Sequence, residues 1–285
     1  MNNMEKNNIT DNKNNLPTIS LVLSITLTIF GIIGNSVVFY IFSRYEFRKE
    51  SFYRYILISN IFDTVNGLLI WPIIYQDYLL KKIPISCVLF YYIGYVTLTF
   101  SAWANVIASV DTYALIKFRK RFEFRQKLNF QLMIMLITFA ISCLINLPHY
   151  FQVVCRVSCS NSESYFHVAY LTIIEIILPF TLMVIFTSLI FHELIASRKK
   201  VANQGNLKKR VRIFKIMFGI NLLFLICHLP QSIVTIIYIS KCTPYLEKIY
   251  FYFTYLRFFY FYLDIFIYFI ANKRFRKYFL THRAD

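Results

Sequence analysis

Four side chains that carry or can accept a charge interrupt long apolar stretches of this sequence. Asp63, Glu175 and Arg257 are ionisable, and His228 can accept a proton. An ionisable group among apolar residues is costly to bury, and such groups usually mark functional sites. His228 could respond to pH, although a neutral, hydrogen-bonded histidine is the simpler interpretation. These four residues are the first candidates for function.

Residue patterns typical of enzymes are incomplete. His192-Glu193 begins the metalloprotease motif H-E-x-x-H, but position 196 is Ala196. The chain has only six glycines and no glycine-rich loop that could hold a phosphate. His149, His167 and His228 do not form the repeated pairs expected of a membrane cytochrome. We therefore expect neither enzymatic activity nor a catalytic metal.

The elements that must position these residues are membrane helices. The 285 residues are 58% hydrophobic, which is too apolar for a soluble domain. About 20 apolar residues cross a bilayer as a helix, and seven stretches are long enough. They are Pro17–Ser43, Tyr53–Leu79, Cys87–Ile116, Phe130–Phe151, Ser164–Leu194, Arg212–Ile239 and Leu246–Ile270. The predicted fold is all-α, a seven-transmembrane helix bundle.

Positive charge is concentrated in alternate connections between these stretches. Of 31 Lys and Arg residues, 23 fall in Arg44–Arg54, Lys117–Lys127, Arg198–Lys215 and Lys273–Arg283. Cytoplasmic loops carry such an excess, so the N-terminus is predicted outside and the C-terminus inside the plasma membrane. The net charge of +17 then reflects orientation and attraction to anionic membrane lipid, and we expect no nucleic-acid partner.

Three regions divide the chain. Residues 1–16 are polar and predict a disordered extracellular arm, in which Asn8 begins a glycosylation sequon. Residues 17–271 form the transmembrane domain. Residues 272–285 contain Phe275, Phe279 and Leu280 among cations, which predicts a short amphipathic helix 8 on the membrane surface and a cytoplasmic tail.

The third stretch ends in Asp111-Thr112-Tyr113, followed by a basic loop. Asp111 follows Cys87 by 24 residues, about 36 Å of helix. Further motifs occur in order along the chain: Gly34-Asn35, Asp63, Pro148, Pro179, Phe224/Cys227/Pro230 and Asp264/Tyr268. Together they resemble the rhodopsin-like (class A) G protein-coupled receptors, and in general style the invertebrate peptide receptors.

This resemblance implies roles for two groups of residues. A polar pocket that takes a sodium ion in the family would be formed by Asn35, Asp63, Ser101 and Asp264. A structural hydrogen-bonded cluster is the alternative. The switch and the G-protein face would comprise Asp111, Thr112, Tyr113, Phe224, Pro230 and Tyr268. The family pattern also implies a disulfide from Cys87 to Cys159, with Cys155 as the alternative partner.

The ligand expected from the resemblance is a peptide or another non-amine molecule. The aminergic Asp is missing, since positions 94 and 95 are Gly94 and Tyr95. Glu175 and Arg257 could bind an arginine side chain and an acidic or amide terminus of a peptide. Alternatively, they pair with each other, as buried charges usually do. The complete predicted ligand set is Tyr95, Glu175, His228, Gln231 and Arg257.

Departures from the family pattern favour a second hypothesis. Thr112 replaces the arginine that the family uses at the G-protein face, and its hydroxyl cannot make the same charged contacts. Other positions that differ are Thr138, Thr187, His228 and Ile265. The alternative is a ligand-binding chemosensory or decoy receptor with weak or no coupling to G proteins. A channel or transporter is disfavoured, since no stretch has a continuous polar face.

Overall fold

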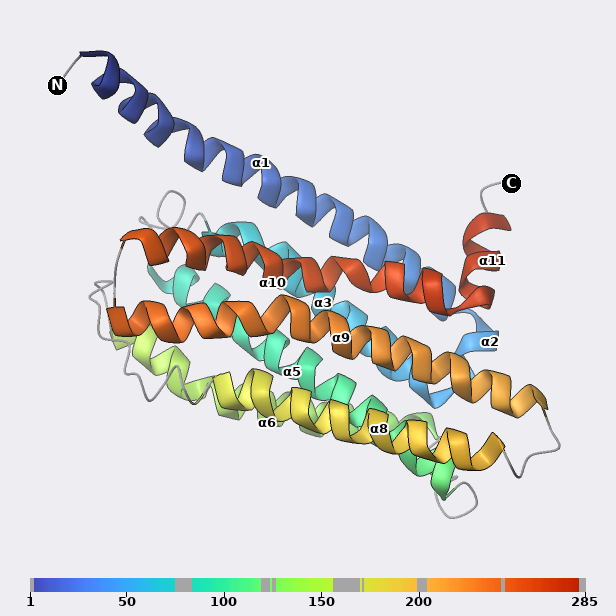
Figure 1. Ribbon diagram of the computed structural model, residues 1–285. Helices are drawn as coiled ribbons and strands as arrows, with labels where there is room; N and C mark the ends of the chain where they lie inside the picture. Colours follow the sequence, from blue (N-terminus) through green and yellow to red (C-terminus); the bar gives the residue numbers. More distant parts are fainter. Residues whose placement is uncertain are drawn as a thin grey trace.

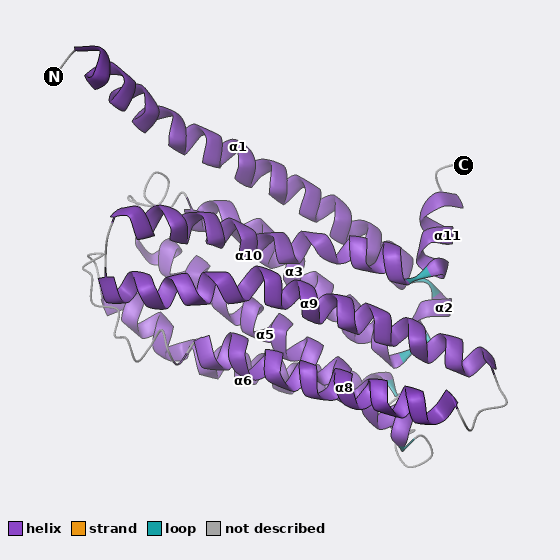
Figure 2. Ribbon diagram, viewed as in Figure 1, coloured by secondary structure: helices purple, strands orange, loops and turns teal. Residues whose placement is uncertain are grey.

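The computed structural model describes residues 3–74, 84–118, 124, 127–155, 170, 172–198, 204–241 and 244–281. The described backbone is almost entirely helical and contains no strand (Figure 2). Its long helices are α1 (Asn3–Phe42), α3 (Ser51–Ile74), α5 (Pro84–Lys117), α6 (Leu128–Cys155), α8 (Leu178–Arg198), α9 (Gln204–Lys241) and α10 (Pro244–Ala271). Short elements are α2 (Tyr45–Arg48), the π-helical turn η2 (Ile173–Ile177) and α11 (Lys273–Thr281).

The long helices run side by side as a bundle (Figure 1). Contacts link α1 to α3, α3 to α5, α5 to α8, α8 to α9, α9 to α10, and α10 back to α1, while α6 packs against α5. The N- and C-termini lie at opposite ends of the bundle in Figure 1, as an odd number of passes requires. We call the end that carries α2 and α11 the α11 end. The predicted seven-helix bundle is confirmed.

Apolar side chains face outward on this bundle. Leu136 and Leu144 are each 68% exposed and Phe30 is 67% exposed, a pattern that suits lipid rather than water. Among the described residues, six helical segments are long and apolar enough to cross a membrane. They are Ser24–Phe42, Tyr92–Lys117, Leu128–Pro148, Ile173–Ala196, Lys208–Ile237 and Tyr252–Ala271.

The helix that corresponds to the second predicted span is α3, which has 24 residues. It carries the polar or charged residues Arg54, Asn60, Asp63 and Asn66. The last three of these side chains are buried, since α3 packs between α1 and α5 inside the ring. Its polar residues therefore face the protein interior.

The N-terminal helix differs from the prediction. Residues 1–16 were expected to be disordered, but α1 begins at Asn3 and continues without a break to Phe42. Extending an existing helix avoids the cost of nucleation, so a polar segment can remain helical when it continues an apolar span. Figure 1 shows this first part of α1 diverging from the bundle. The prediction of disorder was therefore wrong for residues 3–16.

Pro179 shapes the start of α8. A proline inside a helix lacks an N–H and clashes with the carbonyl four residues earlier, here that of Glu175. The chain forms a π turn over Ile173–Ile177 directly before α8, and the wider turn accommodates this clash. Glu175 lies in that turn with its side chain buried. The proline and the π turn thus place a carboxylate inside the bundle.

Candidate functional site

Glu175 is the centre of a buried polar group that we call the Glu175 cluster: Thr99, Asn146, Glu175, Gln231 and Arg257. Glu175 is 3% exposed. Its Oε1 accepts a hydrogen bond of 2.7 Å from the Thr99 hydroxyl, which in turn accepts one of 2.9 Å from Asn146 Nδ2. Three helical elements, α5, α6 and η2, are therefore linked through this carboxylate and the Thr99 hydroxyl.

Arg257 of α10 approaches the same carboxylate from the other side. Its Nη2 lies 4.0 Å from Glu175 Oε2, and its Nη1 donates to Gln231 Oε1 of α9 at 3.4 Å. The structure therefore contains the ion pair that was the alternative to peptide binding. Both contacts of Arg257 are long, so the guanidinium is only weakly held by its neighbours.

His228 lies on α9 one turn before Gln231 and is 1% exposed. Its ring stacks on Phe224 at 4.4 Å and meets the edge of Tyr260 at 4.9 Å. Neither ring nitrogen has a hydrogen-bond partner among the described residues. A buried imidazole usually has one, so the simple prediction of a hydrogen-bonded histidine does not describe this ring. Tyr95, on α5, is half-buried.

The predicted sodium pocket contains two carboxylates. Asp63 Oδ1 accepts a hydrogen bond of 2.6 Å from Ser101 Oγ, and Ser101 lies 3.2 Å from Ser59 Oγ. The Tyr268 hydroxyl is 3.5 Å from Asp264 Oδ2. Asp63 and Asp264 lie on α3 and α10, which pack against each other. The structure thus brings three predicted pocket residues and Tyr268 into one region.

Two polar atoms of this region have no hydrogen-bond partner among the described residues, Asn35 Nδ2 and Asp264 Oδ1. The carboxylate oxygens of Asp63 and Asp264 and the hydroxyl oxygen of Ser101 suit hard cations such as sodium, so these residues fit the ion that the resemblance implies. No group of three or more metal-binding His, Cys, Asp or Glu side chains occurs in the described part of the chain.

The motif at Asp111 lies at the α11 end. Asp111, 1% exposed, accepts a hydrogen bond of 2.8 Å from Ser51 Oγ at the start of α3. Thr112 is buried. The Tyr113 hydroxyl accepts a hydrogen bond of 2.8 Å from Lys117. A serine hydroxyl therefore binds the aspartate next to the position where the family has arginine.

A second cluster at the α11 end was not predicted from the sequence. Glu50, 8% exposed, precedes α3, and its Oε1 lies 3.2 Å from Lys209 Nζ and 3.3 Å from Arg212 Nη2 of α9. We call these three residues the Glu50 cluster. The sequence feature that could have indicated this cluster is the carboxylate Glu50 inside a strongly basic segment. The cluster connects the start of α3 to the beginning of α9.

Two switch residues pack within α9 and α10. Phe224 is 1% exposed and Tyr268 is 2% exposed, and the Phe224 ring meets Tyr260 edge-on at 5.5 Å. Pro230 lies inside α9, where a proline weakens the helical hydrogen bonding. The Tyr260 hydroxyl accepts a hydrogen bond of 2.9 Å from Asn105. Tyr260 was not predicted, yet it contacts both His228 and α5.

The predicted disulfide and glycosylation site lie outside what the structure describes. Cys159 is not among the described residues, and the side chains of Cys87 and Cys155 are not described. The same applies to the side chain of Asn8. Of the cysteines with described side chains, Cys143 and Cys227 are free, as expected for packing residues inside helices.

The comparison with known protein families agrees with this geometry. The family model described as 7 transmembrane receptor (rhodopsin family) matches residues 34–268, which is more than half of the chain. A search of curated proteins found no match to the sequence. The matched region begins at Gly34 and ends at Tyr268, and it includes both the Glu175 and the Glu50 clusters. The chain therefore belongs to the rhodopsin family of seven-transmembrane receptors.

Proposed function

We propose that this receptor binds an extracellular peptide and transmits binding to heterotrimeric G proteins at the plasma membrane. The Lys and Arg residues of α2, the start of α9 and α11 lie at the α11 end. The positive-inside rule favours that end in the cytoplasm. The N-terminus of α1 is then extracellular, with Asn8 available for glycosylation.

The Glu175 cluster is the observation that carries the proposal for the ligand. An acid and a base face each other inside the bundle at 4.0 Å, so each retains capacity for a second charged partner. A peptide that presents an arginine side chain and an acidic or amide group would pair with both. Such a ligand offers better geometry than the existing contact, and it would compensate the cost of burying its own charges.

Further residues extend this site along α9. Gln231 Nε2 donates to Thr254 at 3.3 Å while its Oε1 accepts from Arg257, so its amide orients the guanidinium. His228 lies one turn before Gln231 on α9 and has two ring nitrogens without a hydrogen-bond partner in the described structure. These atoms can accept or donate hydrogen bonds to a peptide backbone. Tyr95 completes the proposed set.

Coupling to a G protein must proceed without an arginine at position 112. In our proposal, the Glu50 cluster restrains the beginning of α9 in the resting receptor, and agonist binding separates Glu50 from Lys209 and Arg212. The signal would pass along α9, since Gln231 and Arg212 belong to the same helix. Asp111 and Tyr113 would then contribute to the G-protein face.

A sodium ion at Asp63 is a further part of the proposal. Asp63, Asp264 and the Ser101 hydroxyl would hold it, and its charge would offset the repulsion between the two carboxylates. The alternative function, a receptor that binds ligand but couples weakly, is favoured by one observation. Thr112 is buried and uncharged, so it offers no cation to a G protein.

The test compares two glutamates on neighbouring elements. Cells expressing the wild type, Glu175→Gln or Glu193→Gln are challenged with a library of arginine-containing, amidated peptides. We expect Glu175→Gln to reduce agonist potency at least tenfold, since a charge-assisted hydrogen bond contributes about 1.5–3 kcal/mol. Glu193→Gln should stay within about twofold, because Glu193 lies in the exposed pair with Lys117. Unchanged potency with reduced surface expression of Glu175→Gln would show that the pair is only structural.

A further inference from the structure

Two threonine–asparagine pairs link α5 to neighbouring helices, and their hydrogen bonds run in opposite directions. In the first pair, the Thr97 hydroxyl donates to Asn66 Oδ1 of α3 at 2.8 Å. In the second, Asn146 Nδ2 of α6 donates to the Thr99 hydroxyl at 2.9 Å. All four side chains are buried. Only the second pair is bonded to a carboxylate, and this contact explains the reversal.

The Thr99 hydroxyl has one proton to donate, and Glu175 Oε1 receives it at 2.7 Å. Thr99 can then only accept from its second partner. Asn146 Nδ2 supplies that donor, and it also donates to the backbone carbonyl of Ser142 at 2.9 Å. An amide oxygen in the same place would face two acceptors, so the orientation of the amide is fixed. We call the hydrogen-bonded series Asn146, Thr99 and Glu175 the Asn146 relay.

The relay leaves one buried atom unsatisfied. Asn146 is 0% exposed, and its Oδ1 has no hydrogen-bond partner among the described residues. Buried polar atoms usually have a partner, and leaving one without a partner is costly. An amide that served only to stabilise α6 would be expected to use both of its ends. The use of its donors alone indicates that the role of Asn146 is to orient Thr99.

The two oxygens of Glu175 have different partners. Oε1 is bound by Thr99 at 2.7 Å, whereas Oε2 lies 4.0 Å from Arg257 Nη2 of α10. Burial away from water disfavours a carboxylate, and a hydrogen bond donated to it favours the charged form. Thr99 therefore offsets part of the cost of burying Glu175, and it holds the carboxylate with Oε2 toward α10.

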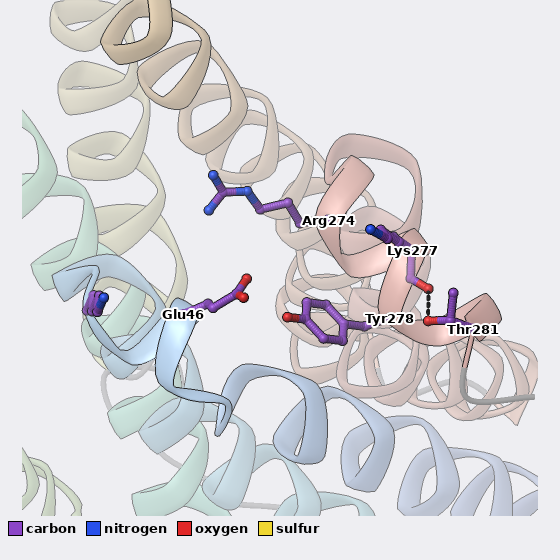
Figure 3. Close-up of a pocket in the computed structure, with 6 residues that line it drawn as sticks. Glu46, Arg274, Lys277, Tyr278 and Thr281 are labelled. Carbon is purple, nitrogen blue, oxygen red and sulfur yellow. Dashed lines mark hydrogen bonds between the residues drawn. The ribbon is translucent and has the colours of Figure 1, made fainter. Parts of the chain in front are cut away.

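A carboxylate at the α11 end has a different environment. Glu46 is exposed and lines a cavity of about 550 Å³ between α2 and α11, where Figure 3 shows Arg274 and Lys277 on the α11 side. Water and nearby cations can balance the charge of Glu46 without a fixed neutral donor. Glu175 is 3% exposed, and among the described residues Arg257 is its one ion-pair partner. The contribution of the relay is therefore specific to the buried carboxylate.

We propose that Asn146 and Thr99 are positioning residues that make the peptide site selective for an arginine side chain over a neutral side chain of the same shape. The inference rests on the proposed binding of a ligand arginine at Glu175. While the relay holds Oε1, Oε2 stays available to a guanidinium N–H group. Without the relay, the carboxylate can rotate and pair with Arg257 through both oxygens. A ligand cation then loses its advantage over a neutral group.

The test compares two forms of one peptide. The probe is the most potent arginine-containing, amidated peptide of the library described above, and its counterpart carries citrulline, which has a similar shape but no charge. The ratio of their potencies in G-protein activation measures arginine selectivity at equal surface expression. The wild type should prefer the arginine form by about tenfold or more. Thr99→Val and Asn146→Leu should reduce this preference to roughly threefold or less.

The first threonine–asparagine pair supplies matched controls. Thr97→Val and Asn66→Leu make the same changes in a pair that is not bonded to Glu175, so both should keep the preference of the wild type. Thr99→Ser retains the hydroxyl and should keep most of it. A purely structural role of the relay would lower expression, or the potency of both peptides together, and would leave their ratio unchanged.

Two results would overturn the inference and leave the proposed function intact. One is a Thr99→Val variant with the preference of the wild type, and the other is a pair of controls that lose as much as the relay variants. A wild type that responds to no peptide, or that does not distinguish the two forms, would refute arginine binding at Glu175 and the inference with it. If Asn146→Leu does not reach the cell surface, Thr99→Val against Thr99→Ser makes the same comparison.

Discussion

The Glu175 and Glu50 clusters each place a buried glutamate beside a cation of a neighbouring helix. Glu175 faces Arg257 of α10, and Glu50 faces Lys209 and Arg212 of α9. Glu50 has two cations, at 3.2 and 3.3 Å, and the Lys209 side chain is 47% exposed. Glu175 has one cation at 4.0 Å, and its shortest contact is a neutral hydroxyl at 2.7 Å. The charge of Glu50 is thus balanced by close, partly hydrated partners, whereas Glu175 and Arg257 depend on each other.

This difference indicates which cluster can open during a helix movement and which can exchange its partner for a ligand. A cluster with two cations, one of them the exposed Lys209, can open and close at lower cost than a buried single pair, which suits a restraint on a moving helix. A buried single pair cannot lose one member cheaply. It can, however, exchange partners with a ligand that brings charges of its own. In our proposal, the Glu175 cluster therefore recognises the ligand and the Glu50 cluster restrains the movement of α9.

The largest effect is expected from Arg257→Met. It leaves Glu175 buried without a cation, so the free energy of unfolding should fall by about 3–5 kcal/mol. Thermal unfolding of the detergent-purified protein measures the loss. The double variant Glu175→Gln/Arg257→Met should recover most of it, since no charge remains buried. A double variant as unstable as Arg257→Met would refute the interdependence of the two residues.

A smaller loss, about 1.5–3 kcal/mol, is expected from Glu50→Gln. The change leaves Arg212, whose side chain is 15% exposed, without its carboxylate. In our proposal it also raises ligand-independent G-protein activation, because α9 is no longer restrained. Glu46→Gln, an exposed carboxylate of the same segment, is the control. Equal behaviour of the two variants would remove the special role of Glu50.

The two cations of the Glu50 cluster should differ. Lys209→Gln is expected to cost roughly 0.2–1 kcal/mol, as exposed pairs do, and Arg212→Gln more, because Arg212 is less exposed. The Lys209 contribution should shrink at high salt. The free energy of unfolding of each variant, measured at low and high ionic strength, separates the contribution of Lys209 from that of Arg212. A larger effect of Lys209 would contradict this order.

The smallest effect is expected from Glu193→Gln. Glu193 lies 3.7 Å from Lys117, and the side chains are 26% and 41% exposed. A pair this accessible contributes at most about 1 kcal/mol. The unfolding temperature should therefore change little, and a loss similar to that of Arg257→Met would show that exposure does not rank these pairs.

Much of the bundle follows from the sequence because lipid imposes long apolar helices. The predicted span Leu246–Ile270 corresponds to α10 (Pro244–Ala271), and α11 lies where the amphipathic pattern near Phe275 predicts it. The helical start of α1 at Asn3 was missed because a polar segment carries no apolar pattern. Its helix is an extension of the apolar span.

The candidate sites were only partly predictable. Glu175 and Arg257 stand out as charges in apolar stretches, and their pairing was one of two alternatives considered. Thr99 and Asn146 were missed because a hydroxyl or an amide in a membrane helix has many local partners, including the backbone. Glu50 and Arg212 are separated by 162 positions. Such a contact depends on the ring closure of the helices, which no local pattern encodes.

The central claim is that this receptor signals although Thr112 stands where the family has arginine. The most direct measurement is G-protein activation by the peptide library in cells that express equal surface amounts of the wild type and Thr112→Arg. The account predicts that the wild type responds, because the Glu50 cluster and the neighbouring cations replace the missing arginine. A response from Thr112→Arg alone would contradict the claim and would identify the natural protein as a ligand-binding receptor without output.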